Sequence, residues 1–197
     1  MKNYAWGTES FNAEPIYVVL FVSRKKDNTN IPNFKERRKS FITHLDKNKL
    51  KRDFQSFVDQ GVPGEFCRLY ISVNARDGVK IHKELLHFLI DNPDFNLCSL
   101  ESKIAGIAAQ KECAKEKRWM FDFDLANHIK MHEFYNDIMS IDNTIQIEVC
   151  CTPHGFALIT NKGFDTRALM EKWGEFVTLK RDDLLCLSWT TTGEKDE

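Results

Sequence analysis

Two periodicities of apolar and polar residues run along the chain and predict where strands and helices lie. Short runs of β-branched and aromatic residues bounded by turn residues predict strands. The predicted strands are residues 16–22, 67–73, 119–124, 145–151, 156–160, 176–179 and 184–189. Apolar side chains spaced three and four residues apart predict helices. The predicted helices are residues 47–60, 79–90, 97–116, 126–139 and 165–173.

The alternation of strands and helices predicts the fold class. A chain of 197 residues has the size of one ordinary domain. Strands that alternate with helices form a sheet on which the helices pack. We therefore expect one α+β domain over residues 1–197, with a mixed or antiparallel sheet. Residues 1–65 would be its basic N-terminal part and residues 66–190 its core.

No apolar run approaches the length of a membrane span. The longest run, residues 16–22, has seven residues, whereas a membrane helix needs about 20. The first ten residues, MKNYAWGTES, lack the apolar core of a secretory signal. The sequence predicts a cytoplasmic protein with no membrane partner.

Charge is concentrated in one segment, although the formal net charge of the whole chain is only -1. Residues 24–52 contain eleven basic and three acidic residues. A solvated surface and a phosphate-facing patch explain such a segment equally well. If it binds nucleic acid, the candidate residues are Arg24, Lys25, Lys26, Arg37 and Arg38.

The segment RWMFDFD, residues 118–124, carries the clearest candidate chemistry. Side chains alternate between the two faces of a strand, so Asp122 and Asp124 share one face while the aromatic residues face the core. Their Cα atoms lie about 6.5–7 Å apart by strand geometry, which lets both carboxylates reach one divalent cation or a pair of cations. Oxygen ligands of this kind suit Mg²⁺ or Mn²⁺. The alternative is a strand end with two solvated aspartates.

Three further residues are candidate phosphate or catalytic groups. His154 lies in the turn TPHG between two predicted strands, and Lys162 lies in the turn that follows the second strand. Arg76 follows the strand 67–73, from which an arginine can hold a phosphate with two hydrogen bonds. The alternatives are an ordinary turn histidine and a surface arginine paired with Asp77.

Taken in order, these motifs resemble the catalytic core of the archaeo-eukaryotic primase superfamily, the primase-polymerases. That family has a hydrophobic strand ending in Asp-x-Asp or Asp-x-Glu, followed by a small-residue turn that leads to a histidine at the start of a strand. WMFDFD fits the first motif and TPHGFALIT is similar to the second. Short phage and mobile-element proteins look similar too. The resemblance covers roughly residues 66–190 and departs from the pattern at Ala157, where the family histidine would stand.

The resemblance implies a primase-polymerase-like core, related to the RNA-recognition fold, with a metal site. Asp122 and Asp124 would hold Mg²⁺ or Mn²⁺, and Asp183 would be the third acidic residue, with Asp182 and Asp165 as alternatives. His154 would take part in catalysis. Nucleoside triphosphates and single-stranded DNA or RNA would be the substrates, in the host cytoplasm if the protein is phage-encoded. A helicase partner stays open.

The expected function is therefore a metal-dependent nucleotidyltransferase in the replication of a phage or mobile element. The alternative is a non-catalytic domain that binds single-stranded nucleic acid on the same sheet, and a protein-interaction domain is a third possibility. A phosphodiesterase would use the same carboxylates. The sequence contains no GxxxxGK[ST] loop, so it is not a P-loop NTPase.

Overall fold

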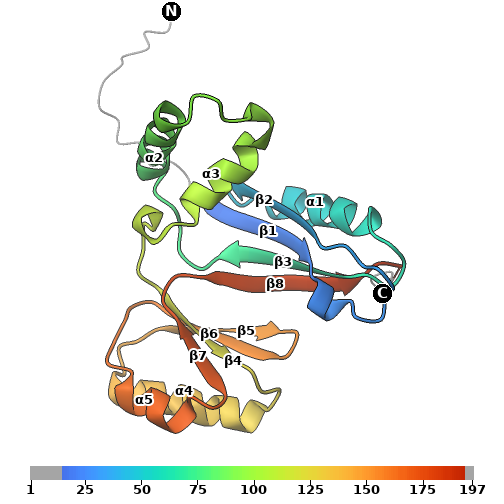
Figure 1. The fold of residues 1–197 in the computed structure, drawn as a ribbon. Coiled ribbons are helices and arrows are strands. Elements are labelled where there is room, and N and C mark those ends of the chain that lie inside the picture. The colour runs from blue at the N-terminus through green and yellow to red at the C-terminus, as the bar shows by residue number, and fades with distance from the viewer. Residues whose placement is uncertain (1–14, 194–197) are drawn as a thin grey trace, which may run out of the picture.

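Two four-stranded sheets form the framework of the protein (Figure 1). The computed structural model describes residues 15–193. In the first sheet the strand order is β2 (Arg37–Thr43), β1 (Tyr17–Ser23), β3 (Phe66–Ser72) and β8 (Leu184–Thr191). In the second sheet the order is β5 (Ile147–Thr152), β6 (Gly155–Thr160), β4 (Trp119–Phe123) and β7 (Val177–Lys180). All neighbouring strands pair antiparallel, which confirms the α+β class.

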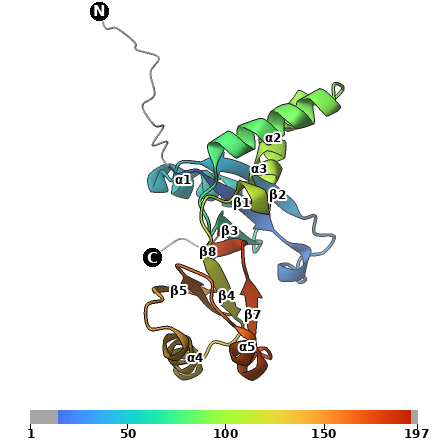
Figure 2. The ribbon, with the colours of Figure 1, turned by 90° about the vertical axis from the view of Figure 1, so that its left-hand side faces the viewer.

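Five α-helices pack around these sheets within residues 15–193. They are α1 (Lys47–Asp59), α2 (Gly78–Asp91), α3 (Leu100–Ala108), α4 (His128–Ile141) and α5 (Arg167–Trp173). Short 3₁₀ turns occur at Lys25–Asp27, Leu97–Ser99 and Lys111–Cys113. Figures 1 and 2 show α4 and α5 together below the second sheet, whereas α1 and α3 lie against the first. Figure 2 also shows α2 extending away from both sheets.

Most predicted elements are present within one or two residues of their expected ends, and two differences have clear causes. The periodicity does not predict strand β2, because its sequence RRKSFIT is dominated by charged and polar residues and lies within the basic segment. It forms because β1 offers a full antiparallel partner from Tyr17 to Ser23. The predicted helix 97–116 is shorter, since its regular part is α3 alone.

The core joins the two sheets. One cluster contains Phe21 and Leu69 of the first sheet, Phe54 of α1, and Met120 and Ile159 of the second sheet. Strand β8 is the edge of the first sheet, and its Leu185 belongs to this same cluster. The face of the second sheet that carries Met120 and Ile159, called the inner face below, therefore packs against the β8 edge. The hydrophobic effect on this shared cluster holds the sheets together.

The outer face of the second sheet has its own core. Phe121 and Phe123 of β4 are fully buried there against Phe134 of α4 and Trp173 of α5. Alternation along β4 thus sends its aromatic side chains away from the first sheet and its other side chains toward it.

None of the helices within residues 15–193 is long and apolar enough to span a membrane. This agrees with the absence of a long apolar run in the sequence. The segment MKNYAWGTES, for which no signal peptide was expected, lies outside the described residues.

A buried polar network fixes the junction between the sheets. The Arg76 guanidinium donates to both carboxylate oxygens of Asp182 at 2.8 and 2.9 Å, and both side chains are buried. The Asn74 side-chain amide donates to Asp182 and also exchanges hydrogen bonds with the backbone of Arg118. These residues follow β3, precede β4 and precede β8. The network therefore ties together the three places where the chain enters or leaves the junction.

Replacement of Asp182 by Ala should destabilise the protein by about 3–5 kcal/mol, because it leaves the Arg76 charge buried without its partner. Urea unfolding followed by circular dichroism measures this loss. Lys162→Ala, at the exposed ion pair with Asp142, is the control and should change the unfolding midpoint little. A midpoint of Asp182→Ala equal to that of the control would contradict the structural role of Arg76.

Candidate functional site

A polar cavity of about 250 Å³ lies where the inner face of the second sheet meets strands β3 and β8. We call it the carboxylate pocket. Its charged and titratable lining residues come from both sheets and their loops, and several of them are far apart in the sequence. They are Arg24, Lys26, Arg68, Tyr70, Asp122, Asp124, His154, Lys180 and Cys186.

Strand β4 supplies the two carboxylates. Phe121 and Phe123 are fully buried on the outer face, so Asp122 projects from the inner face by alternation, and Asp124 follows at the end of the strand. Asp122 lies opposite Ala157 of β6 and Thr178 of β7. The predicted pairing of two aspartates on one side of a strand therefore places both in the carboxylate pocket.

Lys180 is the cation that pairs with Asp122. Its Nζ lies 2.9 Å from Asp122 and 3.4 Å from Asp183, so it bridges the two side chains. Burial lowers the pKa of Lys180, but the hydrogen bond and charge of Asp122 and the charge of Asp183 outweigh burial and hold this pKa above its ordinary value. Lys180 is consequently a fixed positive charge at the carboxylates.

The opposite wall carries a second set of charges. Arg68 donates to Asp27 at 2.8 Å and lies 3.2 Å from the Nε2 atom of His154. Arg24 also donates to Asp27 at 2.8 Å. Burial raises the pKa of Asp27, but the hydrogen bond from Arg24 and the charge of Arg68 lower this pKa by a larger amount, so it lies below its ordinary value. Asp27 therefore stays ionised and orients both guanidinium groups.

The turn between β5 and β6 brings His154 into the pocket. A Cβ atom at Gly155 would lie 2.0 Å from the backbone oxygen of Phe123 and 2.9 Å from the backbone nitrogen of Leu125. The residue must therefore be glycine for this turn to approach the end of β4 so closely. Ala157, at the place of the histidine in the resembling family, is buried opposite Asp122.

Several predicted site residues do not line the pocket. Arg76 is committed to Asp182 in the junction network, and Lys162 pairs with Asp142 at 2.7 Å. Arg37 pairs with Glu65 at 2.6 Å and lies over Phe57. These contacts are structural, because each charge has a partner outside the pocket.

Three other predicted residues have a looser relation to it. Lys25 and Arg38 lie outside the pocket, and Arg38 pairs with Glu36 on the surface. Asp183 does not line the pocket, but its carboxylate pairs with Lys180, which does. The alternative third acid Asp165 pairs with Arg167. Of the basic segment, Arg24 and Lys26 are the residues that the fold brings to the carboxylates.

Sequence analysis missed Arg68 and Lys180. Both lie within strands of apolar character, FCRLYIS and VTLK, where a single charge is the exception. A buried charge needs a partner, and that signal could have drawn attention to Arg68. No sequence signal shows that β7 pairs with β4 and thereby places Lys180 beside Asp122.

The face of the first sheet that borders the pocket continues beyond it to Trp189. Tyr70 lies opposite Cys186, and Arg68 lies opposite Trp189, so these side chains share the face that α1 does not cover. Trp189 is 37% exposed. Arg24 lies over the Tyr70 ring, 6.0 Å from its centre. Aromatic and basic side chains are thus adjacent on this face.

The donor set fits a hard divalent cation that is shared with a ligand. Among the described residues, no group of three His, Cys, Asp or Glu side chains is arranged to hold a metal ion alone. Mg²⁺ is commonly bound by one or two carboxylates together with substrate phosphates, and Asp122 and Asp124 match this number. Burial raises the pKa of Cys186 to about 11, which keeps this pocket thiol protonated at neutral pH.

Gly155→Ala should destabilise the protein by about 1–3 kcal/mol, because the added methyl group forces the backbone apart at the end of β4. Chemical unfolding measures the effect. Gly106→Ala in α3 is the matched control, since no atom lies within 4 Å of the added Cβ and alanine favours a helix. Equal stability of the two variants would show that the turn does not require glycine.

Comparisons with known proteins do not place the chain in a family. Neither protein-family models, nor curated proteins, nor solved structures gave a match. The function must therefore be argued from the residues of the pocket.

Proposed function

We propose that the protein is a metal-dependent nucleotidyltransferase of primase-polymerase type that acts on nucleic acid. One observation carries the proposal: Asp122 and Asp124 share a small polar pocket with Lys180, Arg68, Arg24 and Lys26. Two carboxylates surrounded by cations suit a substrate with many negative charges that arrives with a divalent ion. The motif order that resembles the primase-polymerases supports the same reading.

Asp122 and Asp124 would hold Mg²⁺ or Mn²⁺, which neutralises phosphate charge and activates the attacking 3'-hydroxyl when bound. Asp122 is now paired with Lys180. Once Asp122 binds a cation, the Lys180 ammonium group would pair with a triphosphate instead. Such positioning and neutralisation account for most catalysis in phosphoryl transfer.

The other wall would bind the remaining phosphates. Arg68 is held by Asp27 and is nearly buried, with a side chain 6% exposed, so its position is fixed before any substrate arrives. His154 lies against Arg68 and would contact the same phosphate group. Arg24 and Lys26 would hold the strand backbone at the pocket rim without regard to sequence.

Isothermal titration calorimetry with MnCl₂ and a nucleoside triphosphate tests this proposal. Wild-type protein should bind the triphosphate in a metal-dependent manner, and Asp122→Asn/Asp124→Asn should lose that binding because neutral amides hold the cation poorly. Asp165→Asn, an exposed carboxylate paired with Arg167, is the control and should bind as wild type does. Metal-dependent binding that survives in the double variant would refute the assignment, and primer-extension assays follow if it is lost.

The open sheet face favours a second function, the non-catalytic binding of single-stranded nucleic acid. Sheets bind single strands by stacking bases on exposed aromatic residues beside basic groups. Tyr70 and Trp189 have this arrangement next to Arg68. The same face would guide a strand toward the carboxylates in an enzyme, so binding alone fits both functions and metal dependence separates them.

Trp189→Ala should weaken the binding of a fluorescein-labelled dT oligonucleotide by about 1–3 kcal/mol, the usual contribution of one stacked base. Fluorescence anisotropy over a range of salt concentrations measures both affinity and the number of phosphates neutralised. Leu86→Ala on the exposed side of α2 is the control. An affinity equal to that of the control would remove this face from the nucleic-acid site.

A further inference from the structure

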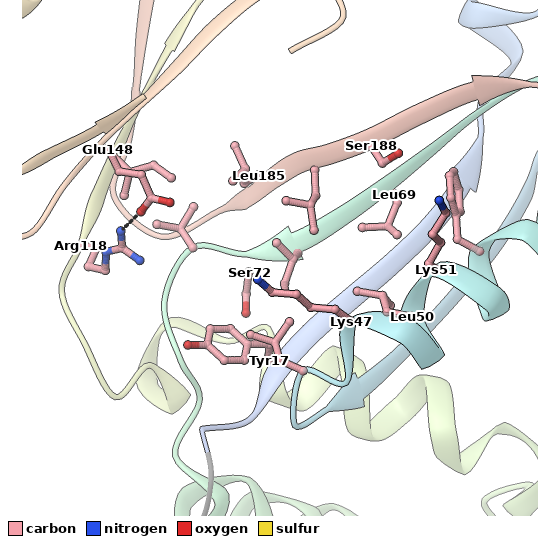
Figure 3. Close-up of a pocket in the computed structure, with 16 residues that line it drawn as sticks. Tyr17, Lys47, Leu50, Lys51, Leu69, Ser72, Arg118, Glu148, Leu185 and Ser188 are labelled. Atoms are coloured by element: carbon pink, nitrogen blue, oxygen red, sulfur yellow. Dashed lines mark hydrogen bonds and ion pairs between the residues drawn. The ribbon is translucent and has the colours of Figure 1, made fainter. Parts of the chain in front are cut away.

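A second cavity, of about 680 Å³, lies against the opposite face of the first sheet, next to α1 (Figure 3). We call it the apolar groove. Leu69 and Ile71 of β3, Leu185 and Leu187 of β8 and Leu50 of α1 line it. Leu185 also borders the carboxylate pocket, so β8 separates the two cavities. The groove is therefore a distinct site that the proposed chemistry does not use.

Three basic residues line this groove. Lys47 and Lys51 extend from α1 on one wall, and Arg118 lies at the far end (Figure 3). Lys47 and Lys51 are exposed, and neither forms an ion pair with another residue of the described chain. Arg118 pairs with Glu148 at 2.6 Å, and the Glu148 side chain is 60% exposed. The groove thus combines an aliphatic floor with two lysines on the α1 wall that are unpaired within residues 15–193, whereas Glu148 offsets the charge of Arg118.

We propose that the apolar groove binds a segment of a partner protein that carries large apolar side chains between acidic residues. The apolar side chains would fill the groove over Leu185 and Leu187, and the carboxylates would pair with Lys47 and Lys51 along the α1 wall. Burial of the apolar anchors provides affinity, and complementary charge fixes the orientation. This inference stands apart from the proposed nucleotidyltransferase activity, since it uses the other side of β8.

The distribution of charge and the lining favour this occupant over two others. A small amphiphile with one anionic head would pair with one of the two lysines, which lie apart along the α1 wall in Figure 3, and would leave the other lysine unpaired. A nucleic-acid strand would need flat aromatic surfaces for its bases, and the aromatic lining residues are Tyr17 and Phe54, of which Phe54 is 6% exposed. The floor is otherwise mainly aliphatic, as side chains such as leucine or phenylalanine of a peptide require.

The test uses the full chain and the fluorescein-labelled synthetic peptide Glu-Asp-Phe-Leu-Asp-Glu, with binding followed by fluorescence anisotropy. Two matched peptides are compared with it, one with Ala in place of Phe and Leu, and one with Lys in place of each acidic residue. The acidic peptide with both anchors should bind, more weakly as salt increases, and both matched peptides should bind poorly.

Two groups of variants place the binding in the groove. Lys47→Glu/Lys51→Glu should weaken binding roughly tenfold or more, because both charges then repel the peptide. Leu187→Asp, at a side chain that is 49% exposed, should weaken it without unfolding the protein. Lys83→Glu/Lys111→Glu carries the same charge change at exposed positions outside the groove lining and should bind as wild type does.

Three outcomes would overturn the proposal. The first is failure of the wild-type protein to bind the acidic peptide, and the second is equal binding by the groove variants and the control. The third concerns competition for a bound 1-anilinonaphthalene-8-sulfonate probe. If oleate or a dT oligonucleotide displaces this probe and the peptide does not, the groove binds an amphiphile or a nucleic-acid strand. None of these outcomes depends on nucleotide binding by Asp122→Asn/Asp124→Asn, so this proposal and the proposed nucleotidyltransferase activity can fail independently.

Discussion

The arrangement of the two sheets depends on the buried ion pair between Arg76 and Asp182. A buried pair of this kind has a high desolvation cost, and its geometry must be good for the charges to be tolerated. Here the guanidinium and carboxylate meet through two hydrogen bonds, and Asn74 adds a third to the same carboxylate. The pair joins the end of β3 to the start of β8, and Asn74 joins both to the start of β4.

The carboxylate pocket exists because that junction is fixed. Asp122 comes from one sheet and Arg68 from the other, and each is held by an opposite charge of its own, Lys180 and Asp27. Both charges therefore have a partner before a ligand enters. The Lys180–Asp122 pair is partly exposed, so an incoming phosphate or cation can replace one of its members without leaving a buried charge unpaired, whereas the Arg68–Asp27 pair is nearly buried.

Strand β8 has a different role on each side. Leu184 and Cys186 face the carboxylate pocket, whereas Leu187 and Ser188 face the apolar groove. The register shift in the pairing of β3 with β8, between Leu69 and Tyr70, comes at this point and alters the alternation of side chains. A partner bound in the groove would thus contact the same strand that borders the proposed catalytic site.

The local structure of this protein and the chemistry of one strand follow directly from the amino-acid sequence. The periodicity of apolar residues gave the positions of most elements, because strand and helix geometry impose those periods directly. Alternation along WMFDFD placed Asp122 and Asp124 together for the same reason. Strand β2 does not follow from this periodicity, since its polar residues form a strand through pairing with β1. The cations that lie near the carboxylates are set by tertiary packing. Strand pairing and sheet packing bring Lys180 and Arg68 to the pocket, while Arg76, Arg37 and Lys162 pair with other residues. The contacts of a long charged side chain depend on which segments the fold brings beside it, and the positions of neighbouring residues in the chain do not contain that information.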